Sequence, residues 1–169
     1  MPTVFIGMPV FNGERFIREA IDSLVNQSYE DWSLLISDNS SEDGTQKICE
    51  LYASHDNRIQ YFRQKTNIGV INNYRFVLDK ADFNYKYFMW AAGDDFRSLD
   101  FIEVNVDALE KYPNYVASTS PNVFPGQDLN SSKISTSLKG TRVQRFKSFF
   151  EHPGTSHAFF YSLMRREIL

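Results

Sequence analysis

Polar side chains follow four successive apolar segments of this 169-residue chain. In chain order, they are Asn12 and Glu14, then Asp38, then Asn67 with Gly69, and last Asp94 with Asp95. Carboxylates that converge without a neighbouring His or Cys favour Mg²⁺ or Mn²⁺ over zinc, and such an ion would bridge phosphate oxygens. The pattern therefore predicts an oxygen-ligand site for a divalent cation and a phosphorylated ligand.

Ordinary structural interpretations of the same residues exist. Paired aspartates after a strand commonly cap the next helix, because carboxylates satisfy its free amide groups. Asp38 alone would be a turn residue, and Asn12 with Gly13 would form a tight turn. The candidates nevertheless share one position, directly after successive apolar segments, and this coincidence favours a common site.

The elements that must position these residues alternate regularly. We predict strands at 3–8, 32–37, 59–62, 85–92 and 115–119, and helices at 14–26, 45–54, 69–78 and 98–111. Such alternation with short connections is typical of βαβ units. The predicted fold class is α/β, an open, mainly parallel sheet flanked by helices, in which ligands bind at the carboxyl ends of the strands.

Several local expectations accompany this assignment. Pro9 should end the first strand, and Leu51, Val70 and Ile71 should lie on the buried faces of their helices. Residues 121–141 are polar and predict a surface loop. Beyond them we predict a short helix near 143–150, a strand at 159–161 and the opening of a helix at 165–169. An end one turn into a helix leaves backbone groups uncapped, which indicates a sequence cut inside its fold.

Composition narrows the class of protein. The formal net charge is −3, so a nucleic-acid partner is not expected. The longest apolar run, at 87–92, is far shorter than the ~20 residues of a membrane-spanning helix, so no transmembrane segment is predicted. A single cysteine, Cys49, forms no internal disulfide and suits a buried helical position in a cytoplasmic protein.

Three motifs together resemble the family 2 inverting glycosyltransferases of the GT-A fold. The first runs from Thr3 to Thr45 and reads TVFIGMPVFNGERFIREAIDSLVNQSYEDWSLLISDNSSEDGT. The second, NIGVINNYRF, matches an Asn-x-Gly-x-x-x-Asn pattern with Asn67, Gly69 and Asn73, and the third, MWAAGDDF, is similar to the family's aspartate metal motif. The resemblance extends to about Pro113, and HAFFYSLMRREIL looks like a later family segment.

The resemblance implies a site for a nucleotide-diphosphate sugar. Residues Pro9 to Phe11 would line the base pocket, with Asn12 and Glu14 beside it. Asp38 would accept a hydrogen bond from the imide N–H of uracil or thymine, and Asn73 or its neighbours would border the nucleotide.

The same resemblance implies metal-assisted transfer. Asp95 would bind Mg²⁺ or Mn²⁺ across the two phosphates, and Asp94 would meet the ribose or support the metal. A separate carboxylate would deprotonate the acceptor hydroxyl, and the family's base lies beyond the segment that ends at Leu169. The sequence departs from the family pattern where Ala92 replaces the first acidic residue of Asp-x-Asp-Asp and where Ser37 replaces a common aspartate.

We therefore expect one domain, 1–169, with a donor-binding part at 1–120 and an incomplete acceptor part at 121–169. Its expected activity is inverting transfer from a UDP- or TDP-sugar to a glycan or lipid-linked acceptor, in cell-surface polysaccharide synthesis. The expected location is the cytoplasm, including the inner membrane surface. The fragment itself is expected to bind nucleotide without transferring sugar.

Other classes stay open on the residues alone. A dehydrogenase is disfavoured because PVFNGE lacks a GxGxxG loop, and a nucleotidyltransferase because no basic, glycine-rich loop stands there. A non-catalytic nucleotide-binding domain remains an alternative.

Overall fold

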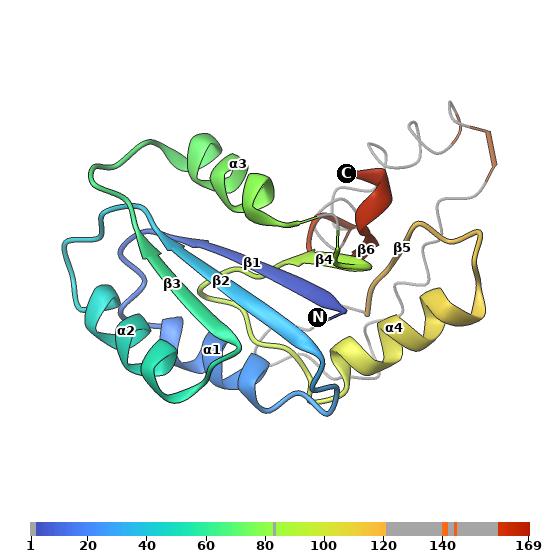
Figure 1. Ribbon diagram of the computed structural model, residues 1–169, viewed down its shortest axis with the longest axis horizontal. Coiled ribbons are helices and arrows are strands. Elements are labelled where there is room, and N and C mark those ends of the chain that lie inside the picture. Colours follow the sequence, from blue (N-terminus) through green and yellow to red (C-terminus); the bar gives the residue numbers. More distant parts are fainter. Residues whose placement is uncertain (1–2, 83, 121–139, 142–143, 145–158) are drawn as a thin grey trace.

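A six-stranded sheet with helices on both faces forms the protein (Figure 1). The computed structural model describes residues 3–82, 84–120, 140–141, 144 and 159–169. In chain order the elements are β1 (Val4–Val10), α1 (Ile17–Val25), β2 (Trp32–Asp38), α2 (Thr45–His55), β3 (Ile59–Arg63), α3 (Val70–Lys80), β4 (Tyr87–Trp90), α4 (Phe101–Lys111), β5 (Ala117–Ser118), β6 (Leu163–Arg165) and the 3₁₀ helix η2 (Arg166–Ile168).

The sheet order is β3-β2-β1-β4-β6-β5. The first four strands in this order are parallel, whereas β6 runs antiparallel to both β4 and β5. Helix α3 covers one face, and α1, α2 and α4 lie on the other (Figure 1). The predicted open, mainly parallel sheet flanked by helices is therefore confirmed.

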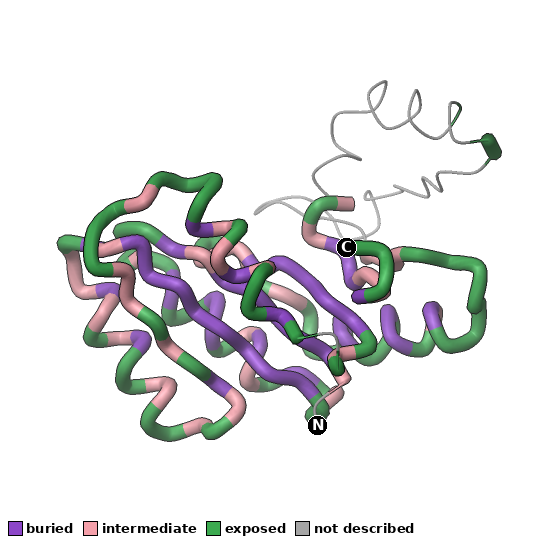
Figure 2. Tube along the Cα trace, turned by 45° about the horizontal axis from the view of Figure 1, so that its top comes forward, coloured by how far each residue is buried: buried purple, intermediate pink, exposed green. Residues whose placement is uncertain are grey.

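Strands β1, β2 and β4 form the centre of the core, shown in purple in Figure 2. Alternate side chains of β1 point to opposite faces, so Ile6 packs in the cluster with Ile21 of α1, while Phe5 joins the cluster beneath α3. Burial on both faces explains why these strands are almost continuously apolar.

Pro9 lies inside β1 and does not end the strand, so that prediction is wrong. The Ala91 amide donates to the Gly7 carbonyl at 2.9 Å, which shows that odd-numbered residues of β1 direct their backbone groups toward β4. The β1–β4 ladder ends at the pair Gly7–Trp90. Proline at position 9 therefore removes no ladder hydrogen bond, because β4 has already ended beside it.

The first turn of α3 also differs from the prediction. Val70 and Ile71 are exposed, and the buried face of the helix carries Asn73 and Val77. A Cβ atom at Gly7 would lie 2.4 Å from Val77 Cγ1, so glycine there allows α3 to approach β1 closely along this face. Tyr74, Val77 and Leu78 of the predicted apolar face pack against the sheet as expected. Val70 and Ile71 lie in the first turn of the helix, outside that cluster.

Two further expectations need correction. Leu51 is exposed on α2, whose buried residues are Thr45 and Cys49. The predicted strand at 159–161 is wrong, because residues 159–160 are helical and the strand that joins the sheet is β6, which pairs antiparallel with β4 and β5. The helix expected to open at 165–169 is the 3₁₀ helix η2. The predicted helix near 143–150 and most of the predicted loop at 121–141 lie outside the described residues.

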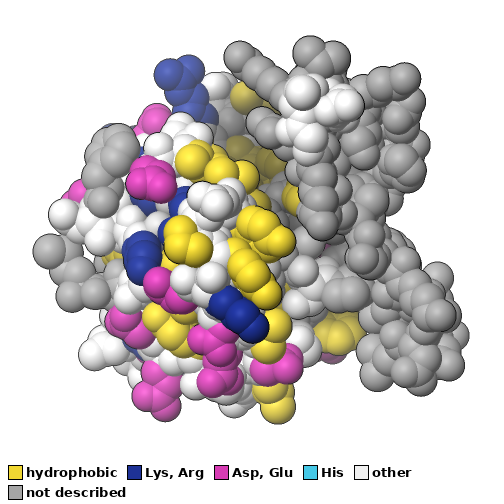
Figure 3. Space-filling view, turned by 90° about the vertical axis from the view of Figure 1, so that its right-hand side faces the viewer, with side chains coloured by type: hydrophobic (Ala, Val, Ile, Leu, Met, Phe, Trp, Pro, Cys, Tyr) yellow, Lys and Arg dark blue, Asp and Glu magenta, His cyan; other side chains and the backbone are white. Residues whose placement is uncertain are grey.

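Apolar side chains are also exposed on the face beyond β5, seen in Figure 3 together with acidic groups. In this part of the chain, Val104 of α4, Tyr112 directly after that helix and Val116 before β5 are about half exposed. No helix within the described ranges is both long and apolar enough to cross a bilayer.

Candidate functional site

The loops after β1, β2 and β4 meet at one edge of the sheet. Val10 and Asp38 are register partners at the ends of β1 and β2, and the Asn39 amide donates to the Val10 carbonyl at 2.8 Å. A Cβ atom at Gly93, after β4, would lie 3.3 Å from Val10 Cγ2 and 3.1 Å from Ile17 Cδ1. Parallel pairing thus places the predicted residues after these strands along the edge where α/β sheets bind ligands.

Asn12 and Glu14 connect the loop after β1 to the loop after β2. The Asn12 amide donates to Ser41 Oγ at 2.9 Å, and Asn12 Oδ1 accepts from the Glu42 amide at 2.9 Å. Glu14 Oε2 accepts from the Gly44 amide at 2.9 Å. Both predicted ligand-binding side chains therefore hold the two loops together, while Phe11 beside them is about half exposed.

The Asp38 carboxylate is fully buried at the end of β2. Its Oδ1 accepts from the Ser41 amide at 2.8 Å and from Ser41 Oγ at 2.6 Å, and its Oδ2 accepts from the Tyr61 hydroxyl at 2.7 Å. Burial, followed by the hydrogen bond to Asp38, raises the pKa of Tyr61. Asp38 thus fixes the first turn of the loop and the neighbouring strand β3, and three of its four lone pairs accept hydrogen bonds from the described residues.

Asn67 and Gly69 lie in the loop between β3 and α3. Hydrogen bonds join this loop to Asn39, directly after β2. Asn39 Nδ2 donates to Asn67 Oδ1 at 2.9 Å, and Asn39 Oδ1 accepts from the Ile68 amide at 2.9 Å. The Gly69 amide also donates to Asn67 Oδ1 at 2.9 Å, and Gly69 has φ +82°, a conformation that favours glycine. Sequence reasoning missed Asn39, although an amide directly after Asp38 was the available signal.

Two more predicted residues are enclosed. Asn73 is buried on α3, where it bonds to Ser37 of β2. Pro9 is half-buried in β1, opposite Ser37. Both residues therefore lie inside the sheet rather than at its ligand-binding edge. Any effect of Asn73 on a ligand would come from holding α3 in place.

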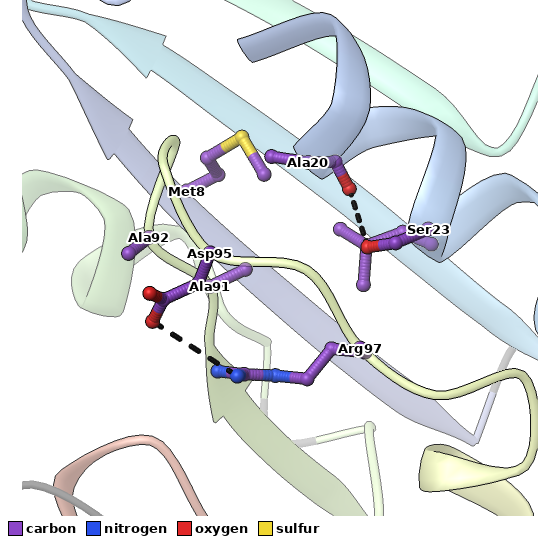
Figure 4. Close-up of a pocket in the computed structure, with 8 residues that line it drawn as sticks. Met8, Ala20, Ser23, Ala91, Ala92, Asp95 and Arg97 are labelled. Atoms are coloured by element: carbon purple, nitrogen blue, oxygen red, sulfur yellow. Dashed lines mark hydrogen bonds and ion pairs between the residues drawn. The ribbon is translucent and has the colours of Figure 1, made fainter. Parts of the chain in front are cut away.

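Asp94 and Asp95 present their carboxylates after β4. Asp94 is exposed, and the Asp95 side chain is 37% exposed. Asp95 Oδ2 lies 3.9 Å from Nη1 of Arg97, and both residues line a narrow pocket that also includes Met8 and Ala20 (Figure 4). Arg97 was not among the predicted site residues, and its signal was a cation two positions after the aspartate pair.

Arg97 is enclosed by aromatic rings. Its guanidinium carbon lies 5.0 Å from the centre of the Phe101 ring and 5.8 Å from that of Tyr161. Burial lowers the pKa of Arg97, and the negative charge of Asp95 opposes this effect. The guanidinium is therefore an almost fully buried cation beside the aspartate pair.

An aromatic cluster brings the carboxyl-terminal segment to the end of β4. Trp90 lies 4.9 Å from the Tyr74 ring and stacks on Phe160 at 6.0 Å, centre to centre, with an interplanar angle of 6°. The Tyr161 and Tyr74 hydroxyl oxygens are 3.2 Å apart. Burial raises the pKa of Tyr161, and the hydrogen bond to Tyr74 and the charges of Asp95 and Asp94 raise it further.

The donor chemistry of this edge fits a cation shared with phosphate. Within the described ranges, no group of three or more His, Cys, Asp or Glu residues could hold a metal by itself. Asp94 and Asp95 supply two hard carboxylates, and Mg²⁺ in proteins commonly takes one or two carboxylates and completes its shell with substrate phosphates and water. These residues therefore suit a phosphate-bridging ion better than a cage made only of protein ligands.

Proteins similar in sequence are glycosyltransferases by name. The Bacillus subtilis protein EpsE, which carries a glycosyltransferase name, is 33% identical over 139 residues, covering 81% of this chain and 49% of EpsE. An uncharacterized glycosyltransferase of Haemophilus influenzae is 31% identical over 140 residues, covering 82% of this chain and 54% of that protein. The chain spans about half the length of these curated relatives.

Solved structures share the fold at low sequence identity. Staphylococcus aureus TarS matches with a TM-score of 0.74 and 16% identity, over 99% of this chain and 29% of TarS. The Pyrobaculum calidifontis mannosyltransferase PcManGT, solved with GDP-Man and Mn²⁺, matches with a TM-score of 0.62 and 20% identity, over 72% of this chain and 36% of that one. These likenesses confirm the expected GT-A architecture.

The sequence model of the family described as "Glycosyl transferase family 2" matches residues 5–169, nearly the whole chain. Strand β2 ends at Asp38, and Asp94 and Asp95 lie in the loop after β4. The chain belongs to glycosyl transferase family 2.

Proposed function

We propose that this chain is the donor-binding part of a glycosyltransferase that moves a sugar from a nucleotide diphosphate to an acceptor hydroxyl with inversion. The observation that carries the proposal is the meeting of three strand-end loops at one edge, where Asp94 and Asp95 are accessible. TarS has been solved with UDP and with UDP-GlcNAc, and PcManGT with GDP-Man, which supports a nucleotide-diphosphate sugar as the ligand class.

The base end of the proposed site lies at the β1 and β2 loops. Phe11 offers a half-exposed ring, and Asp38 offers a carboxylate that only accepts hydrogen bonds. A carboxylate, as a hydrogen-bond acceptor, suits the imide N–H of uracil or thymine and repels the lone pair on N3 of cytosine, which favours UDP or TDP. Because Asp38 is buried under Ser41, direct contact with a base requires the loop at 39–41 to open around it.

The phosphate end lies after β4. Asp95 is the proposed principal ligand of Mg²⁺ or Mn²⁺, with Asp94 supporting the ion or meeting the ribose. When bound, the cation would neutralise charge that develops on the departing diphosphate. The residues of the chain would bind and orient the donor, and the base that deprotonates the acceptor is assigned to none of them.

Acceptor and biological role follow from the family resemblance. We assign a glycan or lipid-linked acceptor, a role in cell-surface polysaccharide synthesis and a location at the cytoplasmic side of the membrane or in the cytoplasm as parts of this proposal. Residues 1–120 would supply the donor half of the site, and 121–169 would begin the acceptor half.

A nucleotide panel tests the proposal. Thermal unfolding is measured with UDP, TDP, CDP and GDP, each with and without Mn²⁺, and a ligand at 100 times its dissociation constant stabilises the folded state by about 2.7 kcal/mol. We expect UDP or TDP with Mn²⁺ to give the largest shift, and uridine monophosphate to give a smaller one. If no nucleoside diphosphate shifts the transition, the proposed function is wrong.

A further inference from the structure

Arg97 is a buried cation with unused hydrogen-bond donors beside the proposed metal ligand. Its side chain is 10% exposed, and Nη1 lies 3.9 Å from Asp95 Oδ2. Its Nε and Nη2 atoms are buried and have no hydrogen-bond partner among the residues that the structure describes. In Figure 4 the guanidinium end is directed toward Asp95.

The surroundings of Arg97 keep its charge in place. The rings of Phe101 and Tyr161 lie 5.0 and 5.8 Å from the guanidinium carbon, and within the described ranges the ion pair of Arg97 is with Asp95. Burying a charge is costly unless an opposite charge compensates it, so Arg97 depends electrostatically on the Asp95 carboxylate.

The separation of the two groups determines what else Asp95 can bind. At 3.9 Å the contact is an ion pair without a hydrogen bond, so it leaves the oxygen lone pairs of Asp95 available. A divalent cation that approaches these lone pairs meets a fixed positive charge in a partly desolvated position, where repulsion is screened less than at an exposed site.

We infer that Arg97 makes cation binding at Asp95 conditional on the diphosphate. Arg97 weakens the binding of free Mg²⁺ or Mn²⁺ to the nucleotide-free protein, and a nucleoside diphosphate restores binding by adding negative charge at the same edge. By thermodynamic linkage, the cation strengthens diphosphate binding by the same factor. This inference rests on the proposed function, because it takes Asp95 as the ligand of the ion.

The test measures Mn²⁺ binding directly, by the loss of the free-ion signal in electron paramagnetic resonance. Arg97→Met removes the charge and keeps an unbranched apolar side chain between the rings, and we expect it to tighten Mn²⁺ binding to the nucleotide-free protein roughly tenfold. Binding in the presence of UDP should change less, so the ratio of the two affinities falls. Arg97→Lys, which keeps the charge, should stay close to wild type.

A matched control is available on α3. Arg75 and Asp79 also lie 3.9 Å apart, but their side chains are 79% and 68% exposed. Arg75→Met should leave Mn²⁺ binding unchanged, and adding Asp95→Asn to Arg97→Met should abolish the gain. Arg97→Gln repeats the measurement with a polar side chain if the Met variant does not fold.

Each outcome separates the two proposals. Unchanged or weaker Mn²⁺ binding by nucleotide-free Arg97→Met and Arg97→Gln overturns the role of Arg97, even where UDP binds the wild type normally. Failure of the wild type to bind any nucleoside diphosphate, with or without Mn²⁺, overturns the proposed function and the diphosphate dependence together, whatever the variants show.

Discussion

Ser37 and Asn73 hold each other through two buried hydrogen bonds that join β2 to α3. Ser37 Oγ donates to Asn73 Oδ1 at 2.6 Å, and Asn73 Nδ2 donates to the Ser37 carbonyl at 2.9 Å. Position 37 is one of the two places where the chain departs from the family pattern, and here the serine hydroxyl serves the packing of α3. Asn73 therefore places the helix and its preceding loop at the edge.

Removing this pair should destabilise the fold. Asn73→Ala removes both hydrogen bonds and leaves Ser37 Oγ with Gln64 Nε2, at 3.2 Å, as its remaining side-chain partner. The variant is expected to lower the free energy of unfolding by about 1–3 kcal/mol, measured by urea denaturation. Asn72→Ala is the control, since Asn72 is exposed and donates to the Ile68 carbonyl. A loss for Asn72→Ala as large as that for Asn73→Ala would contradict the structural role of the buried pair.

Base preference should depend on Asp38. Asp38→Asn keeps the shape and adds a donor, so it is expected to reduce the preference for UDP over CDP, measured by calorimetry. Tyr61→Phe removes one hydrogen bond to the carboxylate and keeps its charge, so it should preserve the preference while lowering stability by about 1.5–3 kcal/mol. Tighter binding of CDP than UDP by the wild type would overturn the assignment.

Asp95→Asn should weaken UDP binding only when Mn²⁺ or Mg²⁺ is present. The amide removes an anionic ligand but leaves any metal-free contacts to base and ribose in place. Calorimetry with and without the ion measures the difference. Asp79→Asn, at an exposed position of α3, controls for the loss of one charge. Equal weakening in both conditions would show that Asp95 acts as a structural residue.

The contact between the loop after β1 and the loop after β2 should loosen in acid. Partial burial opposes ionisation of Asp43, but hydrogen bonds from Thr45 and from the Glu14 amide outweigh it and hold the pKa below its usual value. A lowered pKa means that stability is present near neutral pH and is lost as the pH falls from about 5 through the folded-state value. The protection factors of the Glu14 and Thr45 amides, which are hydrogen-exchange rates corrected for the slower intrinsic exchange in acid, should fall over this range. Asp43→Asn should remove that dependence.

Cys49 should resist thiol reagents in the folded protein. Its side chain is fully buried, and burial, followed by the charges of Asp38, Asp43 and Glu50, raises its pKa to about 12. Reaction with a disulfide reagent at pH 8 is therefore expected only on unfolding. Leu51→Cys in a Cys49→Ala background places a thiol at an exposed position of the same helix and should react rapidly. Rapid labelling of folded wild type would show that α2 opens under native conditions.

The central sheet can be predicted from the amino-acid sequence. Strands β1, β2 and β4 are buried on both faces, so their residues form compact apolar runs, and helix α1 shows its buried stripe at Ile17, Ala20, Ile21 and Leu24. These signals are local, because each depends on the period of a single element. Polar residues at the strand ends then identified the edge, since parallel strands end together.

The roles of those polar residues depend on contacts between distant parts of the chain. Asn12 and Glu14 bond to a loop about 30 residues away, and Asn73 bonds to Ser37 across 36 positions, so no local pattern reveals that their hydrogen bonds are already made inside the protein. The same holds for β6, whose pairing with β4 joins residues far apart in the chain. Arg97 shows the limit most clearly, because its burial, rather than its position after Asp95, makes its charge effective: the rings of Phe101 and Tyr161 exclude the water that would otherwise screen it.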